Sequence, residues 1–283
     1  MSSFPNEGEK KRKREICMRC KRPKPNTCIC SALPTEPLTL SKCRVIVLQH
    51  PHEQRRKNRS LPLVELCFDK SYSSRSGRNN SCSNNEEGKS QNNTKCQNES
   101  QLSIVNNDFH CIIARRLGDQ VDPDLMTLIN DPNQIFFLVY PSNESIPLKK
   151  ALEQNDIVEH KNEIANKSII LFFIDATWKY ANEMLKAGFK QNIWPSHMIR
   201  VKLTNDDFAA GFQPRRFDIR TPPSLDQLST AECIAQCVRL VEGRDDIFDL
   251  LMKPLDLMVK QWHSFSDNDE RNPSKRAKTK DCK

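Results

Sequence analysis

The chain has 283 residues, a hydrophobic fraction of 37% and a formal net charge of +8. Its mean hydropathy of -0.68 is low for this length, which predicts disordered segments around a folded domain. The sequence lacks an apolar run long enough to cross a membrane, and its basic N-terminus lacks the apolar stretch of a secretory signal. We therefore expect a reducing compartment, where the 12 cysteines are thiols or metal ligands. The positive charge favours a polyanionic partner.

Both ends of the chain are basic. Residues 1–15 contain KKRKR, and residues 266–283 contain SKRAKTK. Such clusters are typical of nuclear-localisation signals that bind importin, or of nucleic-acid contacts. The alternative is a solvated tail with no partner. We expect both segments to be disordered, and we expect the protein in the nucleus and the cytoplasm.

The first ordered segment, residues 16–36, is rich in cysteine. Cys17 and Cys20 are spaced C-x2-C, and Cys28 and Cys30 follow as C-x-C. Four thiolates this close in sequence can surround one tetrahedral Zn²⁺, which would fold a segment too small to have its own core. The spacing and the compartment favour a structural zinc module over four unrelated reduced cysteines.

The next segment, residues 43–265, reads as one α/β domain. Apolar runs rich in β-branched and aromatic residues predict strands within 43–51, 110–116, 133–141, 167–176 and 197–204. Near-continuous apolar strands separated by helices are typical of a mainly parallel sheet with helices on both faces. Residues 69–108 are dominated by Ser, Asn and charge, and they are predicted to be a disordered insertion.

Helices are predicted between and after these strands, within 122–131, 146–156 and 178–188, with Gly188 as the terminator of the last. The final stretch also reads as helical, with Ser229 and Glu232 spaced as a capping box. Cys233 and Cys237 accompany an apolar stripe there. They could share a metal, but the stripe favours a core position.

Asp175 stands where the most apolar strand ends, and Thr177 and Trp178 follow it. In open α/β sheets ligands bind at the carboxyl ends of the strands, which favours a functional site at these residues. The alternative is that Asp175 or Thr177 caps the helix that follows. The pattern by itself leaves both possibilities open.

Two further polar groups could bind a ligand. His50, Glu53 and Arg56 follow the first strand directly, although they could equally form the polar start of a helix. Arg216 and Arg220, with Arg215, lie in a proline-bounded loop before the capped helix. Guanidinium groups suit phosphate or carboxylate, and a solvated loop is the alternative.

The absent motifs exclude several classes of enzyme. With 7 glycines, the chain has no G-x-G-x-x-G and no Walker loop, which disfavours a Rossmann methyltransferase and an NTPase. It also lacks H-E-x-x-H and a nucleophile elbow.

These segments together resemble the DTW-domain family, the tRNA-uridine aminocarboxypropyltransferases, and most closely its second eukaryotic subgroup. The four-cysteine segment, QHPHE, LVYP, DATW and RRFDIRTPPSLDQLSTAE occur in the family's order. D-x-T-W is the name-giving motif, with Ala176 in its variable slot.

The resemblance implies a SPOUT-like fold with a knotted C-terminus and a specific reaction. Such enzymes bind S-adenosylmethionine and move its 3-amino-3-carboxypropyl group to N3 of a tRNA uridine, giving acp³U and methylthioadenosine. All carbons on the sulfonium are electrophilic, so geometry selects the one that N3 attacks. Uridine must lose its N3 proton, a carboxylate within hydrogen-bond reach can take it, and we assign this role to Asp175 as a hypothesis.

The resemblance also distributes roles to the neighbouring residues. Thr177 would orient the carboxylate or the uracil, and Trp178 would stack on a base or line the pocket. Leu138, Tyr140 and Pro141 are the expected neighbours of the adenosine, and Arg216 or Arg220 would bind the cofactor carboxylate or a tRNA phosphate. His50, Glu53 and Arg56 are the expected substrate-binding residues.

Two rival functions stay open. The first is a SPOUT-type RNA methyltransferase, which would release S-adenosylhomocysteine in place of methylthioadenosine. The second is a non-catalytic, zinc-containing RNA-binding protein, which would not bind S-adenosylmethionine.

Overall fold

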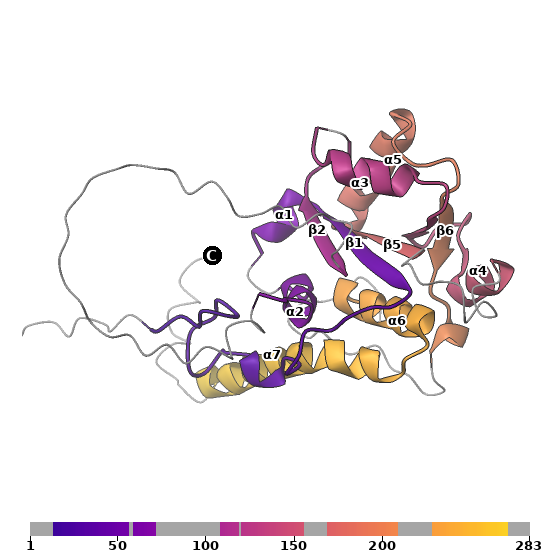
Figure 1. Cartoon of the computed structure of the whole chain (residues 1–283). Helices are drawn as coiled ribbons and strands as arrows, with labels where there is room; N and C mark the ends of the chain where they lie inside the picture. Colours follow the sequence, from indigo (N-terminus) through magenta and orange to yellow (C-terminus); the bar gives the residue numbers. More distant parts are fainter. Residues whose placement is uncertain are drawn as a thin grey trace, which may run out of the picture.

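The computed structural model describes residues 14–56, 59–71, 108–118, 120–155, 169–208 and 228–270. In this part of the chain, strands form one sheet in which all pairings are parallel, with the order β2-β1-β5-β3-β6-β4 (Figure 1). The strands are β1 (Cys43–Gln49), β2 (Phe109–Ile113), β3 (Ile135–Val139), β4 (Ile146–Pro147), β5 (Ile169–Asp175) and β6 (Ile199–Lys202). The predicted α/β class and parallel sheet are confirmed.

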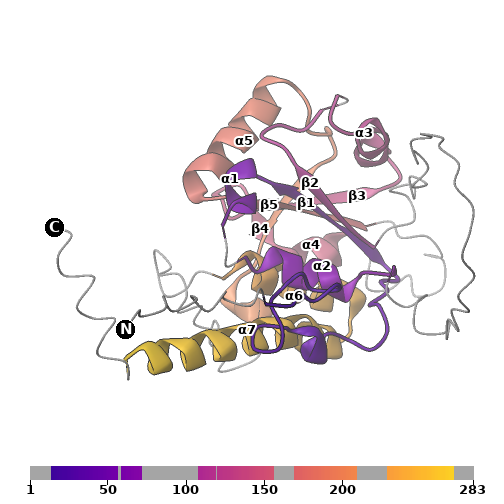
Figure 2. The ribbon, with the colours of Figure 1, turned by 90° about the vertical axis from the view of Figure 1, so that its left-hand side faces the viewer.

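Helices cover both faces of the sheet, as Figures 1 and 2 show. Along β5, the side chains of Ile169, Leu171 and Phe173 join one apolar core, and those of Ile170 and Phe172 join the other. The first core contains residues of α2 (Leu61–Cys67), α4 (Leu148–Gln154), α6 (Thr230–Glu242) and α7 (Asp246–Glu270). The second contains residues of α3 (Pro123–Asn130) and α5 (Trp178–Lys190). Burial on both faces explains why β3 is apolar throughout and why β5 is apolar up to Ile174.

The predicted helix starts are confirmed where a side chain caps them. Asp122 accepts a hydrogen bond from the Leu125 amide at 2.9 Å at the start of α3. Ser229 and Glu232 form a capping box at the start of α6. Each cap satisfies backbone amides that have no partner inside the helix.

Several boundaries differ from the predictions, among them the start of β2 at Phe109. Gly188 does not end α5, which continues to Lys190. A Cβ at Gly188 would lie 2.4 Å from Nε1 of Trp194, so this glycine permits a close side-chain approach rather than a turn. The predicted helix 146–156 opens with the two-residue strand β4, and α7 extends beyond residue 265 to Glu270.

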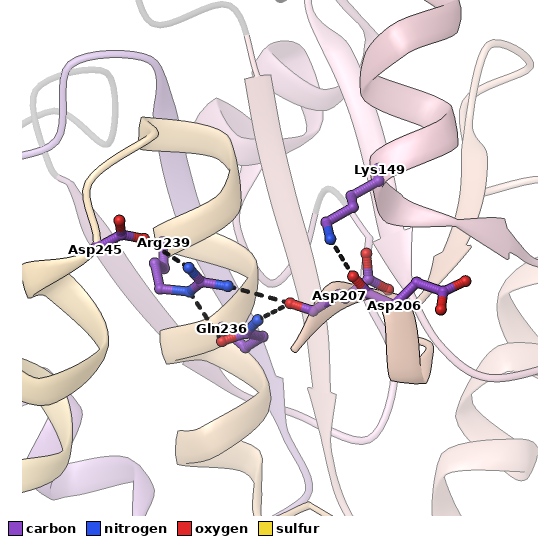
Figure 3. A network of polar contacts seen from close by, with 6 residues as sticks. All are labelled: Lys149, Asp206, Asp207, Gln236, Arg239 and Asp245. Carbon is purple, nitrogen blue, oxygen red and sulfur yellow. Dashed lines mark hydrogen bonds and ion pairs between the residues drawn. The ribbon is translucent and has the colours of Figure 1, made fainter. Parts of the chain in front are cut away.

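Buried hydrogen bonds fix α6 to the sheet. Glu242, at its last position, accepts from the amides of Ser41, Lys42 and Cys43 at 2.9 to 3.1 Å. Near the middle of the helix, Gln236 and Arg239 donate to the carbonyl of Asp207, which lies in the segment after β6 (Figure 3). The N-terminus of α6 is therefore held in place by contacts at two other points on the helix.

Two of the cysteines predicted to lie in the core are on α6. Cys237 is fully buried with Ile234, Val238 and Val241, and Cys233 is partly buried beside them. Within the described ranges, neither belongs to a group that could hold a metal. The core position is confirmed.

The cysteine-rich segment packs directly on α7. Ile29 is fully buried in the same core as α6 and α7, and the Gln261 side chain donates to the Cys28 carbonyl at 2.9 Å. The segment therefore shares its core with the domain that follows it. None of the described helices is long and apolar enough to span a membrane.

Candidate active site

Asp175 lies at the carboxyl edge of the sheet, between the ends of β1 and β3. In the strand register it stands opposite Gln49, the last residue of β1. The next strand in the chain, β2, pairs with one side of β1. The strand after it, β3, lies on the other side of β1, beyond β5. Strand order reverses here, and this is where open parallel sheets bind ligands.

Both carboxylate oxygens of Asp175 accept hydrogen bonds. Nε2 of Gln49 donates to Oδ2 at 2.7 Å, and Oγ1 of Thr230 donates to Oδ1 at 2.7 Å. The His50 amide donates to the Asp175 carbonyl at 2.9 Å. The end of β1, the end of β5 and the start of α6 thus meet at one carboxylate.

Thr177, not Asp175, caps the helix that follows. Its hydroxyl accepts from the Tyr180 amide at 3.5 Å at the N-terminus of α5. The carboxylate of Asp175 is directed instead to Gln49 and Thr230. Of the two residues considered as the cap of this helix, the structure therefore assigns that position to Thr177.

Trp178 and Tyr140 form an aromatic corner beside Asp175. The two rings lie 5.9 Å apart at 62°, an edge-on contact, and the Trp178 side chain is 44% exposed. The Tyr140 hydroxyl donates to Asn182 at 3.2 Å, and burial raises the pKa of that hydroxyl. An exposed indole held by a second ring offers a flat surface to a planar ligand.

Leu138 and Pro141 lie on either side of Tyr140 but in different environments. Leu138 is fully buried in the core under α3 and α5, so its side chain faces no open space. Pro141 is exposed at the edge. Of the three expected adenosine neighbours, Tyr140 and Pro141 reach the surface of the site.

His50 is packed against α5. Its ring stacks on Tyr180 with centroids 4.2 Å apart, and Nδ1 accepts from the His52 amide at 3.2 Å. Burial lowers the pKa of His50, and the nearby charges of His52 and Arg115 lower it further. His50 is therefore a buried, neutral cap of the short helix α1 (Pro51–Gln54).

Glu53 and Arg56 belong to the same turn as His50. Glu53 is buried in the first turn of α1 and lies 3.3 Å from Nε of Arg56, measured from Oε1. The alternative considered for these residues, the polar start of a helix, is therefore present in the structure. The Arg56 side chain is 45% exposed, and it lies in the turn that follows β1.

Additional arginines lie at this edge. The Ala114 amide, just after β2, donates to the Gln49 carbonyl at 3.1 Å, and Arg115 and Arg116 follow with exposed side chains. Arg55 is likewise exposed at the end of α1. In the described ranges, these three have no ion pair with a carboxylate. Arg215, Arg216 and Arg220 lie outside the described residues.

Two functional candidates were missed in the sequence, namely Gln49 and Thr230. Both stand inside segments that carry the family resemblance, QHPHE and LSTAE. Gln49 could have been recognised as a polar residue that ends an otherwise apolar strand. The contact of Thr230 with Asp175 joins residues 55 positions apart and has no local signal.

The four predicted metal ligands come together. Their sulfur atoms all lie within 4.8 Å of one another, with 3.4 Å between Cys17 and Cys30 and 3.7 Å between Cys20 and Cys28. Sulfurs about 2.3 Å from one tetrahedral Zn²⁺ lie roughly 3.8 Å apart. Hydrogen bonding to the Cys20 backbone lowers the pKa of Cys17 to about 6, while burial raises the pKa of Cys30. The donor set fits a four-thiolate metal site.

An open cavity of about 590 Å³ lies at the other edge of the sheet. It is lined by Asn130 at the end of α3, Phe189 near the end of α5 and the loop before β6. Because these residues precede the strands that lead to the carboxyl edge, the cavity is separate from the Asp175 site.

The fold and site define an α/β protein with a hydrogen-bonded carboxylate at a strand switch point and a cluster of four cysteines that could hold a metal. The chain belongs to the DTW domain family, which it matches over residues 14–263. No solved structure gives a significant match.

Curated relatives from distant organisms are named tRNA-uridine aminocarboxypropyltransferases. The chain is 27% identical over 248 residues to tRNA-uridine aminocarboxypropyltransferase 2 of Drosophila melanogaster, covering 88% of this chain and 75% of the relative. It is 25% identical to the enzyme of the same name from Macaca fascicularis, covering 87% and 63%. Against tRNA-uridine aminocarboxypropyltransferase A of Arabidopsis thaliana it is 25% identical, covering 81% and 74%.

Proposed function

We propose that the chain transfers the 3-amino-3-carboxypropyl group of S-adenosylmethionine to N3 of a uridine in tRNA, releasing methylthioadenosine. Membership of the DTW domain family over residues 14–263 supports the class of reaction. The observation that carries the proposal to residues is the Asp175 carboxylate, held at the strand switch point beside an exposed indole.

Asp175 is the general base in this proposal. Attack by uridine requires loss of the N3 proton, and a carboxylate within hydrogen-bond reach accepts it. Trp178 stacks on the uracil or lines the pocket, and Thr177 maintains the turn that presents both residues. Tyr140 and Pro141, with Arg216 or Arg220, hold S-adenosylmethionine.

The same edge suits a polyanionic substrate. Arg56 is half-exposed, and Arg55, Arg115 and Arg116 extend the positive charge over the ends of β1 and β2. Guanidinium groups bind phosphate oxygens without reading the base sequence. These arginines contact the tRNA backbone while the target uridine enters beside Asp175. His50 and Glu53 shape that side of the site as buried supports.

Zn²⁺ at the four cysteines is structural. Four protein thiolates complete a tetrahedral site and leave no open position for catalysis. When bound, the metal stabilises the segment that packs on α7.

The proposal includes a SPOUT-like fold with a knotted C-terminus. The all-parallel sheet supports it, as does the return of α6 after β6 to pack against β1 and β5. An experimental structure that traces residues 209–227 tests the knot by showing whether the chain passes through an earlier loop. The basic tails provide importin contacts, and the protein divides between nucleus and cytoplasm.

The test is identification of the products. Purified protein, S-adenosylmethionine and tRNA should yield acp³U and methylthioadenosine in equal amounts, measured by mass spectrometry. S-adenosylhomocysteine with a methylated nucleoside would show an RNA methyltransferase instead. Failure to bind S-adenosylmethionine with correct folding would favour a zinc-containing RNA-binding protein.

A further inference from the structure

We propose that Gln49 and Thr230 are positioning residues for the reacting carboxylate, and that they leave Oδ1 of Asp175 as the oxygen that takes the uridine proton. The inference rests on the proposed function, because it assigns the proton of that reaction. Neither residue contacts the transferred group in this scheme; both act through Asp175.

The geometry comes from three elements. Gln49 ends β1 and is 2% exposed, Asp175 ends β5, and Thr230 is the first residue of α6. The two hydrogen bonds, each 2.7 Å, reach different oxygens of the carboxylate. An aspartate otherwise rotates broadly about its terminal torsion. Two opposed donors fix that rotation and therefore fix the direction of the free lone pairs.

The chemistry of the two donors differs. The amide nitrogen of Gln49 can only donate, whereas the hydroxyl of Thr230 can donate or accept. Both donate to the Asp175 carboxylate in this structure. After proton transfer, Oδ2 stays a carbonyl-type acceptor for Gln49, while the Thr230 hydroxyl can adapt to a protonated Oδ1.

The step balances in atoms and electrons. The N3–H bond of uridine breaks, its electron pair stays on N3, and an O–H bond forms on Oδ1. N3 then bonds to the aminocarboxypropyl carbon of S-adenosylmethionine. The carbon–sulfur bond breaks with its electrons on sulfur, and methylthioadenosine leaves.

A purely structural role for these contacts is redundant. Backbone pairing and the His50 amide already join β1 to β5. The Ser229–Glu232 capping box already starts α6, and Glu242 and Arg239 already anchor it. After removal of the Thr230 hydroxyl, other contacts therefore still join β1 to β5 and still anchor α6 to the sheet.

The test compares Thr230→Val, which keeps the shape and removes the hydroxyl, with Thr230→Ser, which keeps the hydroxyl. Single-turnover rates of acp³U formation are measured across pH, with S-adenosylmethionine binding and thermal unfolding as controls. For Thr230→Val we expect a rate loss of roughly tenfold or more and an acid limb shifted to higher pH, since the charged form loses a donor. Thr230→Ser should restore most of the rate and the original acid limb.

A second variant, Gln49→Met, removes the donor to Oδ2 without touching α6. It should lower the rate and move the acid limb in the same direction. An unchanged rate and pH profile in Thr230→Val would overturn the inference. So would a rate loss with no pH shift and no rescue by serine, or the failure of both Thr230→Val and Gln49→Met to fold.

The wild-type enzyme separates this inference from the proposed function. If wild type forms no acp³U, the proposed function fails, whatever the variants do. If wild type forms acp³U and the variants behave like it, the positioning roles fail alone.

Discussion

Asp175 and Trp178 are three positions apart and occupy opposite kinds of surroundings. Asp175 is half-buried with both oxygens held, which suits a group that must keep one orientation during proton transfer. The Trp178 ring is 44% exposed against the edge of Tyr140. The two side chains are therefore suited to chemistry and to stacking, respectively.

Replacing Trp178 with alanine should weaken tRNA binding more than the chemical step. A base stacked on an aromatic side chain contributes about 1–3 kcal/mol, so the KM for tRNA should rise by a factor of about 5 to 150. The measurement is steady-state kinetics with varied tRNA at saturating S-adenosylmethionine. Trp178→Phe keeps a ring and should lie near wild type. An unchanged KM in Trp178→Ala would rule out the stacking role.

Among the helices, α6 connects the carboxyl ends of the strands, where Asp175 lies, to the amino end of β1. Thr230 at its start contacts Asp175, and Glu242 at its end binds the amides that precede and begin β1. Burial raises the pKa of Glu242, but hydrogen bonds from Ser41, Lys42 and Cys43 outweigh that effect and lower it. The charged carboxylate is thus the stabilised form.

Glu242→Gln should destabilise the fold by about 2–4 kcal/mol, because an amide group would face donors that need an acceptor. Urea unfolding of the variant and wild type at neutral pH measures this change. Glu153→Gln, at an exposed position on α4, is the matched control and should change stability little. Equal midpoints for Glu242→Gln and wild type would contradict the anchoring role.

Removal of zinc should destabilise the cysteine-rich segment and the core that it shares with α6 and α7. The cysteine segment buries Ile29 in the core shared with α6 and α7, so loss of the metal exposes apolar surface. We expect one Zn²⁺ per chain by elemental analysis, and a lower metal content and melting temperature for Cys28→Ser. Cys111→Ser, outside the cluster, should keep both values. Full zinc retention in Cys28→Ser would show that this cysteine is not a ligand.

The helices and strands were predictable where local chemistry determines them. The apolar runs of β1, β3 and β5 and the caps Asp122 and Ser229 were read correctly, because burial and capping leave a pattern in adjacent residues. The end of α5 was not predicted correctly. Gly188 makes room for the side chain of Trp194, and the local sequence does not encode this contact.

The candidate site was predictable to the same extent. The sequence predicted the cluster of four cysteines from their spacing, and it placed Asp175 and its aromatic neighbour at the end of a strand, as the structure has them. The sequence did not predict which of Asp175 and Thr177 caps α5, because that depends on side-chain directions. Thr230 reaches Asp175 only after α6 has packed on the sheet.

At the scale of the whole molecule, positive charge gathers beside the site. Arg55, Arg115 and Arg116 are exposed at the ends of β1 and β2. The charge of Arg115 helps to lower the pKa of His50. Neighbouring strands lie about 4.8 Å apart, so β2 ends roughly 10 Å from Asp175. That distance suits phosphates flanking a uridine held at Asp175.

The double variant Arg115→Glu/Arg116→Glu should raise the KM for tRNA and reduce its dependence on salt concentration, because fewer phosphate contacts release fewer counterions. The KM for S-adenosylmethionine should stay unchanged. Kinetics at several salt concentrations measure both effects. Lys179→Glu, an exposed position on α5, is a control for a general change in charge. Equal tRNA affinity and salt slope in the double variant would exclude these arginines from the RNA path.

The most direct measurement is the product yield of wild type and Asp175→Ala with S-adenosylmethionine and tRNA. Wild type should form acp³U and methylthioadenosine in equal amounts. Asp175→Ala should fold, retain at least part of its S-adenosylmethionine binding, and lose activity by a factor of about 100 or more. Wild-type rates of acp³U formation in Asp175→Ala would contradict the general-base role, and S-adenosylhomocysteine from wild type would contradict the reaction itself.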